Sequence, residues 1–337
     1  MSYKLKTLIV FDTNSLRSTE AGEVAYSFFS FGRPYQVVEG FIAEKNLTDE
    51  IHIAIPKWAI EELKDQKQRQ YNEDIAEFQK LATRLNGLPH MPALAIQEDA
   101  FDCKEYVETK AEEFIATKEI KLLEIKEETA NSVLHSMMAR VIKEEGRKAP
   151  FANSGKYKDA GFKDNIVWES LMNFDEVANY DKIIFLTKDG DYNRHCEDEF
   201  RSKWTKHITI IKDENNVVAT LQKDYDNYIK ERVIHDFAQT EYFKDYLKAE
   251  LNSKTTITID GIDHKIENYT IVDYCDKVER FPNEELEIEN IFIFSTVKIH
   301  YTDNNGTKQK HEVIINTVLE DEDTKEFIAT EYNTELT

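Results

Sequence analysis

Acidic residues stand in four short segments of this chain, each beside a predicted strand or in the first turns of a predicted helix. The segments are Phe11-Asp12-Thr13-Asn14, Ile60-Glu61-Glu62-Leu63, Lys163-Asp164-Asn165 and Thr187-Lys188-Asp189-Gly190-Asp191. Open α/β sheets place their sites at the carboxyl ends of parallel strands. Three or four carboxylates brought together there cannot all stay ionised without cations. The pattern therefore predicts a Mg²⁺ or Mn²⁺ site built from hard oxygen ligands.

Each of these segments also has an ordinary structural explanation. Asp12 and Asp164 suit the N-terminus of a helix, where a carboxylate caps free amides and meets a favourable dipole. Glu61 and Glu62 could pair with neighbouring lysines on a helix surface, and residues 188–191 could form a plain turn. Because all four segments lie at the edges of α/β elements in one predicted domain, their joint occurrence favours a shared site over four unrelated caps.

The elements that must position these acids alternate between strand and helix. Short apolar runs predict strands at 5–11, 51–55, 183–186 and 207–211. Helices are expected at about 19–31, 36–46, 56–86, from 164 onward, and at 192–200 and 214–251. A charged stretch at about 99–145 is expected to form an inserted helical pair, with Leu122 and Leu123 among its apolar residues. The alternation predicts an α/β fold with a parallel sheet flanked by helices.

Beyond Leu251 the apolar pattern changes from the period of a helix to the alternation of a strand. Strands are predicted at 256–260, 265–272, 286–301 and 308–319. Asp260-Gly261 and Asn304-Asn305-Gly306 are hairpin turn signals. We therefore divide the chain into an α/β domain at 1–250 and a β-rich α+β domain at 251–337.

The chain is strongly acidic, with a formal net charge of −22 over 337 residues. Residues 231–337 hold 24 acidic and 11 basic side chains and so carry −13 of this charge. Bulk negative charge is unfavourable for a nucleic-acid binder, whose affinity rests largely on phosphate neutralisation. A nucleic-acid function would need local basic patches and a metal, and the C-terminal part is not expected to hold such a substrate.

Cysteine usage and hydropathy point to the cytoplasm. Cys103, Cys196 and Cys275 are far apart and show no paired spacing, which suits a reducing compartment and argues against a zinc or disulfide scaffold. No apolar run approaches the roughly 20 residues of a membrane span. The apolar stretch from Leu8 to Phe11 is too short for a signal peptide and is expected to be a strand.

Taken together, the acidic motifs resemble those of PIN-domain nucleases. That family has an Asp before Thr-Asn at the end of the first strand, a Glu-Leu pair in a helix, a central Asp opening a helix, and a Thr-x-Asp-x-Asp-aromatic turn. The matching residues are Asp12-Thr13-Asn14, Glu62-Leu63, Asp164 and Thr187 to Tyr192. The resemblance covers about residues 5–212, and the long interval before Asp164 is similar to the larger bacterial branch. The C-terminal region shows no such resemblance.

Two other folds with acidic sites fit less well. Haloacid-dehalogenase phosphatases need a second Asp two residues after the first, and this chain has Asn14 there. A von Willebrand-type metal site needs hydroxyls two and four residues after the Asp, and those positions are Asn14 and Leu16.

The resemblance implies metal-dependent hydrolysis of phosphodiester bonds. The residues that would hold one or two Mg²⁺ or Mn²⁺ ions are Asp12, Glu62, Asp164 and Asp189, with Asp191 nearby. Asn14 and Thr187 would orient these ligands or the bound water. RNA cleavage is the common activity in the family, so single-stranded RNA is favoured over DNA as substrate.

A loop at 146–163 is locally basic and is a candidate for holding the nucleic-acid backbone. Its candidate contacts are Arg147, Lys148, Lys156 and Lys163. Phe151 or Tyr157 could stack on a base. The alternative is a solvated linker whose charge is incidental.

Two other functions stay open on the sequence. A PIN-like module could bind RNA or protein with weak or no catalysis, with the acidic C-terminal domain as a docking surface for a protein partner. A metal-dependent phosphatase of small molecules would suit the negative bulk charge. The sequence also leaves self-association open.

Overall fold

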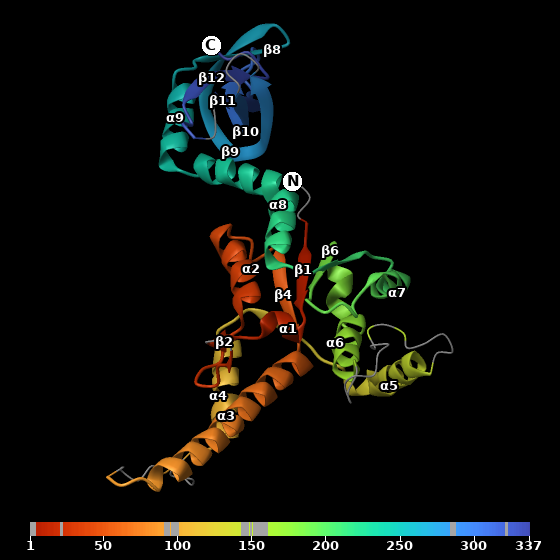
Figure 1. Cartoon of the computed structure of the whole chain (residues 1–337). Helices are drawn as coiled ribbons and strands as arrows, with labels where there is room; N and C mark the ends of the chain where they lie inside the picture. The colour runs from red at the N-terminus through yellow and green to blue at the C-terminus, as the bar shows by residue number, and fades with distance from the viewer. Residues whose placement is uncertain are drawn as a thin grey trace. The chain divides into compact units, whose positions relative to one another are not determined.

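Two compact units make up the computed structural model, and they divide between Asp224 and Tyr225 (Figure 1). The structure describes residues 5–20, 23–90, 95, 101–142, 148, 150, 161–283, 288–320 and 323–337. The division lies inside α8 (Glu214–Ala238), ahead of the predicted boundary near residue 250. The later part of α8 belongs to the C-terminal unit because Ile234 and Ala238 are buried in that unit's core.

A five-stranded parallel sheet forms the centre of the first unit, in the order β5-β4-β1-β6-β7. Its strands are β1 (Thr7–Phe11), β4 (Ile51–Pro56), β5 (Ile120–Leu123), β6 (Lys182–Leu186) and β7 (Ile208–Ile211). Every neighbouring pair is parallel. All residues of the central strand β1 are buried, as expected for a sheet covered on both faces. The predicted α/β fold is confirmed.

Strand β5 lies in the segment that we expected to be wholly helical. The two inserted helices are present, as α4 (Cys103–Ala116) and α5 (Glu127–Val141), but β5 separates them. Leu123, expected on a helix, instead pairs with Pro56 at the end of β4. A run of four residues is too short for its period to distinguish strand from helix, so the open edge of β4 decided the outcome.

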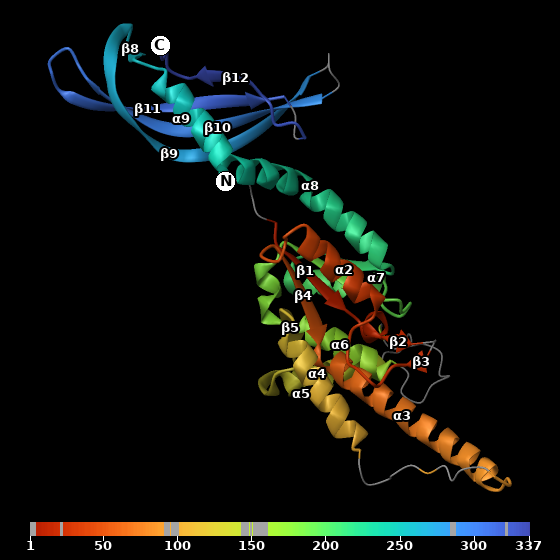
Figure 2. The ribbon, with the colours of Figure 1, turned by 90° about the vertical axis from the view of Figure 1, so that its left-hand side faces the viewer.

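Helices cover both faces of the sheet (Figures 1 and 2). On one face lies α2 (Arg33–Glu44), whose Tyr35 ring is centred 5.6 Å from the ring of Phe11 in β1. On the other face lie α6 (Phe162–Met172) and α7 (Arg194–Trp204). The long helix α3 (Lys57–Asn86) follows β4 directly and runs beside α4. Among the described helices, none is both long and apolar enough to cross a membrane.

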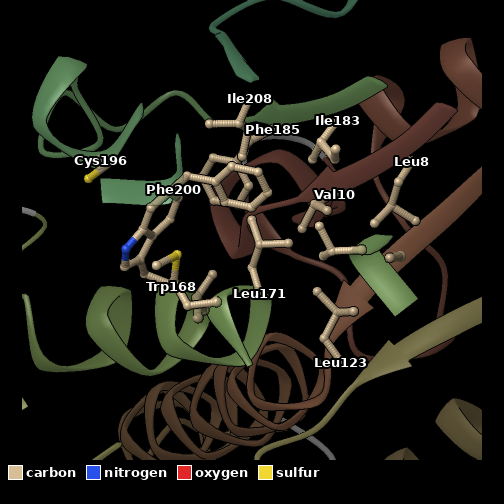
Figure 3. Packing of buried hydrophobic residues seen from close by; sticks show 14 of the residues in the cluster. Leu8, Val10, Leu123, Trp168, Leu171, Ile183, Phe185, Cys196, Phe200 and Ile208 are labelled. Atoms are coloured by element: carbon tan, nitrogen blue, oxygen red, sulfur yellow. The ribbon is translucent and has the colours of Figure 1, made fainter. Parts of the chain in front are cut away.

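The hydrophobic core between the sheet and α6 holds that helix in place (Figure 3). Leu8 and Val10 of β1 pack there with Trp168 and Leu171 of α6. Trp168 is fully buried, and its ring is nearly perpendicular to that of Phe185 in β6, with centroids 6.1 Å apart. Because α6 carries Asp164, one of the predicted acids, this packing fixes the position of that acid relative to the sheet.

The connection from β1 to α2 is not the predicted helix at 19–31. It contains the short helix α1 (Thr13–Leu16) and a small hairpin of β2 (Thr19–Glu20) and β3 (Glu23–Val24). Gly32 closes the connection, because its N–H donates to the Leu16 carbonyl at 2.8 Å. A Cβ atom at Gly32 would lie 2.2 Å from the carbonyl oxygen of Arg17, so no larger residue fits.

A buried lysine of α3 ties this connection down. The ammonium of Lys67 donates to the carbonyl oxygens of Ala25 and, at 3.0 Å, of Phe28. The side chain is almost wholly buried, and this burial lowers the pKa of Lys67 to about 8. The sequence of residues 19–31 does not predict this contact, because Lys67 lies far along the chain.

The second unit is a five-stranded antiparallel sheet packed against helices, in the order β12-β11-β10-β9-β8. Its strands are β8 (Thr256–Ile259), β9 (Ile262–Asn283), β10 (Ile288–Thr302), β11 (Lys308–Leu319) and β12 (Phe327–Tyr332). The predicted β-rich region is confirmed, although β12 was not predicted. Residues after β12 hydrogen bond with β8, since Thr258 N donates to the Glu335 carbonyl at 3.0 Å. The two edge strands are therefore linked.

The helix predicted at 214–251 is interrupted. A second helix, α9 (Glu241–Asn252), starts after Thr240, whose Oγ1 accepts a hydrogen bond from the amide of Phe243. Phe243, Leu247 and Leu251 of α9 are buried in the core of the C-terminal unit. These three residues recur with helical spacing, so the apolar face of α9 is what joins it to the sheet.

Candidate metal centre

Strands β1 and β6 bring the first acid and its hydrogen-bond partner to the same edge of the sheet. Their register pairs Phe11 with Leu186, so Asp12 and Thr187 both follow the last paired residues. The Asp12 amide donates to the Leu186 carbonyl oxygen at 3.0 Å. Thr187 Oγ1 donates to Asp12 Oδ2 at 2.9 Å, and both residues are buried. Asp12 is thus fixed at the carboxyl end of the central strand.

The turn after β6 supplies two further acids. The Asp189 amide donates to Thr187 Oγ1 at 3.0 Å, and the Asp191 amide donates to Asp189 Oδ1 at 2.8 Å. Side chains of Thr and Asp commonly bond backbone amides two residues on and so stabilise turns. The order Thr-x-Asp-x-Asp therefore sets the local geometry of the segment.

A third element adds Asp164 to the acids of this turn. Helix α6 begins after Gly161, whose φ of 78° lies in the left-handed region, and Asp164 is in its first turn. The hydroxyl of Tyr192 donates to the backbone carbonyl of Asp164 at 2.9 Å and links α6 to the end of the turn. Carboxylate oxygens of Asp164, Asp189 and Asp191 lie within 4.8 Å of one another. This trio could hold a metal ion.

Glu62 reaches the same neighbourhood from α3, whereas Glu61 does not. Burial raises the pKa values of Asp12 and Asp164, and repulsion from Glu62 adds to both rises. Lys163 Nζ lies 3.4 Å from Glu62 Oε1. Glu61 instead pairs with Lys64 at 2.8 Å, on a different side of the helix.

Burial raises the pKa values of three acids of the site, Asp12, Asp164 and Asp191. Burial raises the pKa of Asp12 to about 6, although the hydrogen bond from Thr187 opposes the rise. Burial, followed by repulsion from Asp12 and Asp189, raises the pKa of Asp164 to about 7. Burial and then repulsion from Asp189 raise the pKa of Asp191, while the Lys212 ammonium opposes this. A bound cation would favour the ionised form of every member.

The donor set fits a hard divalent cation. The three clustered ligand groups are all carboxylates, with no histidine or cysteine in the trio, which suits Mg²⁺ or Mn²⁺. Two buried side-chain oxygens directly follow acids of the site in the chain, Thr13 Oγ1 and Asn165 Oδ1, and neither has a hydrogen-bond partner among the described residues.

The remaining predicted residues fall into four groups. Asn14 is exposed on α1, two residues after the buried Asp12. Lys148 is engaged in an ion pair, with its Nζ 2.9 Å from Glu199 Oε1. Lys163 borders the acids. Arg147 and Lys156, together with Phe151 and Tyr157, lie outside the described residues.

Sequence reasoning missed two features around the site. Lys212, directly after β7, donates to backbone carbonyls of the acidic turn. Arg140 of α5 is buried and bonds Glu169 of α6 at 2.9 Å and Glu199 of α7 at 2.7 Å. The contact of Lys212 with the acidic turn could have been predicted, because this residue directly follows the strand next to β6. Nothing in the local sequence distinguishes Arg140 from a surface arginine.

Comparison with known proteins gives one match. A family model described as the PIN domain matches residues 9–192, more than half of the chain. The match starts in β1 and ends at Tyr192, so it spans all the acids described above. No curated protein and no solved structure matches the chain. The C-terminal unit lies outside the family match.

Proposed function

This chain belongs to the PIN domain family, and from that premise we propose that it is an endoribonuclease that cleaves single-stranded RNA with Mg²⁺ or Mn²⁺. The PIN domain is generally a metal-dependent nuclease fold. The observation that carries the proposal is the approach of Asp164, Asp189 and Asp191 to within 4.8 Å at the carboxyl edge of the sheet. If each acid only capped a helix or a turn, nothing would explain why the three carboxylates lie together despite their mutual repulsion.

The proposed ligands divide by position. Asp164, Asp189 and Asp191 would contact one or two ions, and Asp12 and Glu62 would complete the shell. When bound, such an ion activates a water and offsets the charge that develops on the phosphate. The chain's own contribution is to hold its carboxylates together and oriented at one edge of the sheet, where a bound cation would favour their ionised form. Asn14, exposed beside Asp12, would orient a ligand or a water from the solvent side.

Thr187 has a distinct part in this arrangement. Its hydroxyl donates to Asp12, and its oxygen accepts the Asp189 amide, so one side chain orients two acids. Hydrogen bonds to an ionised carboxylate lower its pKa, which opposes the effect of burial on Asp12. Loss of such an outer partner typically costs about 10–100-fold in metal affinity.

Lys163 is the best-supported contact for the RNA backbone. It lies beside Glu62 and is about one-third exposed, so it could reach a phosphate next to the acids. Arg147 and Lys156 are proposed to extend this contact. Lys148 is a weaker candidate because Glu199 already binds its ammonium. The acidic C-terminal unit would not hold the substrate, since phosphate avoids negative surfaces.

The proposal can be tested on the purified full-length chain after chelation of bound metals. Labelled single-stranded RNA, single-stranded DNA and a chromogenic phosphate ester would be incubated with Mg²⁺ or Mn²⁺, with Asp164→Asn as the inactive control. We expect metal-dependent internal cleavage of RNA that Asp164→Asn abolishes. Faster hydrolysis of the phosphate ester would favour a small-molecule phosphatase. RNA binding without cleavage at any metal concentration would favour a binding module.

A further inference from the structure

Lys212 directly follows β7 and lies close to the acidic turn that follows β6. Strand β7 pairs with β6, and their register ends with Leu186 opposite Ile211. The Thr187 amide continues the pairing by donating to the Ile211 carbonyl at 3.0 Å. Lys212, the next residue, is therefore beside Thr187, where the acidic turn begins.

The side chain of Lys212 crosses this turn. Its ammonium donates to the carbonyl oxygen of Asp189 and, at 3.1 Å, to that of Tyr192. These two carbonyls flank Asp191, and the hydroxyl of Tyr192 in turn bonds the Asp164 backbone. One ammonium thus bridges the turn from its middle to its end. The residue itself remains exposed, so the bridge lies at the solvent side of the site.

We propose that Lys212 is a positioning residue, which holds the turn so that Asp189 and Asp191 face Asp164 in the arrangement that binds a metal ion. This inference rests on the proposed metal site but not on RNA as the substrate. Two bonds inside the turn, Asp189 N to Thr187 Oγ1 and Asp191 N to Asp189 Oδ1, fix its start. The bridge made by Lys212 ties down its second part, together with the bond from the Tyr192 hydroxyl to the Asp164 carbonyl.

A positioning role and a simple charge effect predict opposite changes in metal affinity when Lys212 is removed. A lysine near a cation site repels the cation, so its removal should tighten metal binding if only charge matters. If Lys212 positions the turn, its removal should weaken binding, because the carboxylates must then be ordered by the metal itself. The direction of the change therefore separates the two roles.

The chain offers a matched control in the same turn. Lys188 carries the same charge and is exposed, and its side chain makes no hydrogen bond or ion pair with the described residues. Lys212→Met and Lys188→Met would be compared with wild type and with Lys212→Arg, whose guanidinium can still donate to two carbonyls. Mn²⁺ affinity would be measured by calorimetry on the full chain. Exchange of the Asp189 and Asp191 amides would be measured by hydrogen–deuterium exchange without metal.

We expect Lys212→Met to weaken Mn²⁺ binding about tenfold, roughly the loss of one well-placed contact. The amides of Asp189 and Asp191 should exchange faster in this variant, while Lys188→Met leaves both measurements unchanged and Lys212→Arg restores them. Unchanged or tighter Mn²⁺ binding by Lys212→Met, or unchanged amide exchange, would overturn the proposal. If the wild type binds Mn²⁺ but fails to cleave RNA, only the proposed substrate is wrong. The amide exchange needs neither metal nor RNA.

Discussion

Thr187 and Asp12 come from neighbouring strands far apart in the chain, and the Thr187 hydroxyl donates to the Asp12 carboxylate at 2.9 Å. The parallel register of β1 and β6 makes this contact unavoidable, since each residue directly follows a paired position. The same hydroxyl oxygen accepts the Asp189 amide, so it links the central strand to the acidic turn. The pair therefore joins two of the proposed ligands through one buried side chain.

Replacing Thr187 with Val should weaken metal binding without unfolding the chain. The methyl that replaces the hydroxyl fills its space but gives Asp12 no donor, and a hydrogen bond to a charged group contributes about 1.5–3 kcal/mol. We expect Mn²⁺ affinity, measured by calorimetry, to fall at least tenfold. Thr187→Ser keeps the hydroxyl and should bind nearly as wild type. Equal loss in both variants would mean that the methyl group, not the hydroxyl, matters.

Of the adjacent glutamates, Glu62 and not Glu61 should be required for cleavage. Glu62 lies close enough to Asp12 and Asp164 to repel them, whereas Glu61 pairs with Lys64. Successive helix residues point about 100° apart, so the two cannot share one site comfortably. Glu62→Gln should reduce the cleavage rate by more than tenfold, and Glu61→Gln should leave it near wild type. If Glu61→Gln abolishes cleavage and Glu62→Gln does not, then Glu61 and not Glu62 belongs to the site.

The metal-free chain should lose stability as pH rises from about 4 to 7. Burial raises the folded pKa of Asp12 to about 6 and that of Asp164 to about 7, above the ordinary value of 3.8. The folded state therefore binds more protons than the unfolded state in this window, and stability falls as these protons leave. Thermal melting with a chelator should be lower at pH 7.5 than at pH 5. Mn²⁺ should raise the melting temperature more at pH 7.5, and Asp164→Asn should flatten the profile.

Replacing Arg140, which lies in a buried ion-pair network, should lower the free energy of unfolding more than replacing an exposed arginine. Arg140 bonds Glu169 and Glu199 with its guanidinium almost fully buried. Removing one partner of a buried ion pair leaves an uncompensated charge, at a cost of about 3–5 kcal/mol. Chemical denaturation should show this loss for Arg140→Met. Arg201→Met, which breaks an exposed pair with Asp198, should cost about 0–1 kcal/mol. Similar losses would argue against the buried network.

Truncation should succeed at the division between the compact units and fail at the predicted domain boundary. A chain ending at residue 251 would keep α9 but remove the sheet that buries Phe243, Leu247 and Leu251. Exposed apolar surface of this kind promotes association. We expect residues 1–224 to be monodisperse by light scattering and to bind Mn²⁺, and residues 1–251 to aggregate. A soluble 1–251 fragment would mean that α9 folds independently of the sheet.

Much of the first unit follows from local sequence. The strands β1, β4, β6 and β7 are short apolar runs, and a buried parallel strand needs little else. The turn at Thr187 to Asp191 also follows locally, because its side chains bond amides two residues on. The family assignment came from these same local motifs, and the family match confirms it.

Contacts between distant segments decided the rest. Whether 120–123 formed a strand depended on the open edge of β4, and Lys67 of α3 ties down Ala25 and Phe28 ahead of α2. The resemblance to the family's Glu-Leu pair already favoured Glu62 over Glu61, and the repulsion between Glu62 and the acids of the site supports that choice. Local sequence determines which residues can be ligands, because ligand chemistry belongs to side chains. Only the tertiary structure decides which of these possible ligands lie close together and which lysine contacts their turn. The distances between them are set by packing between elements far apart in the chain.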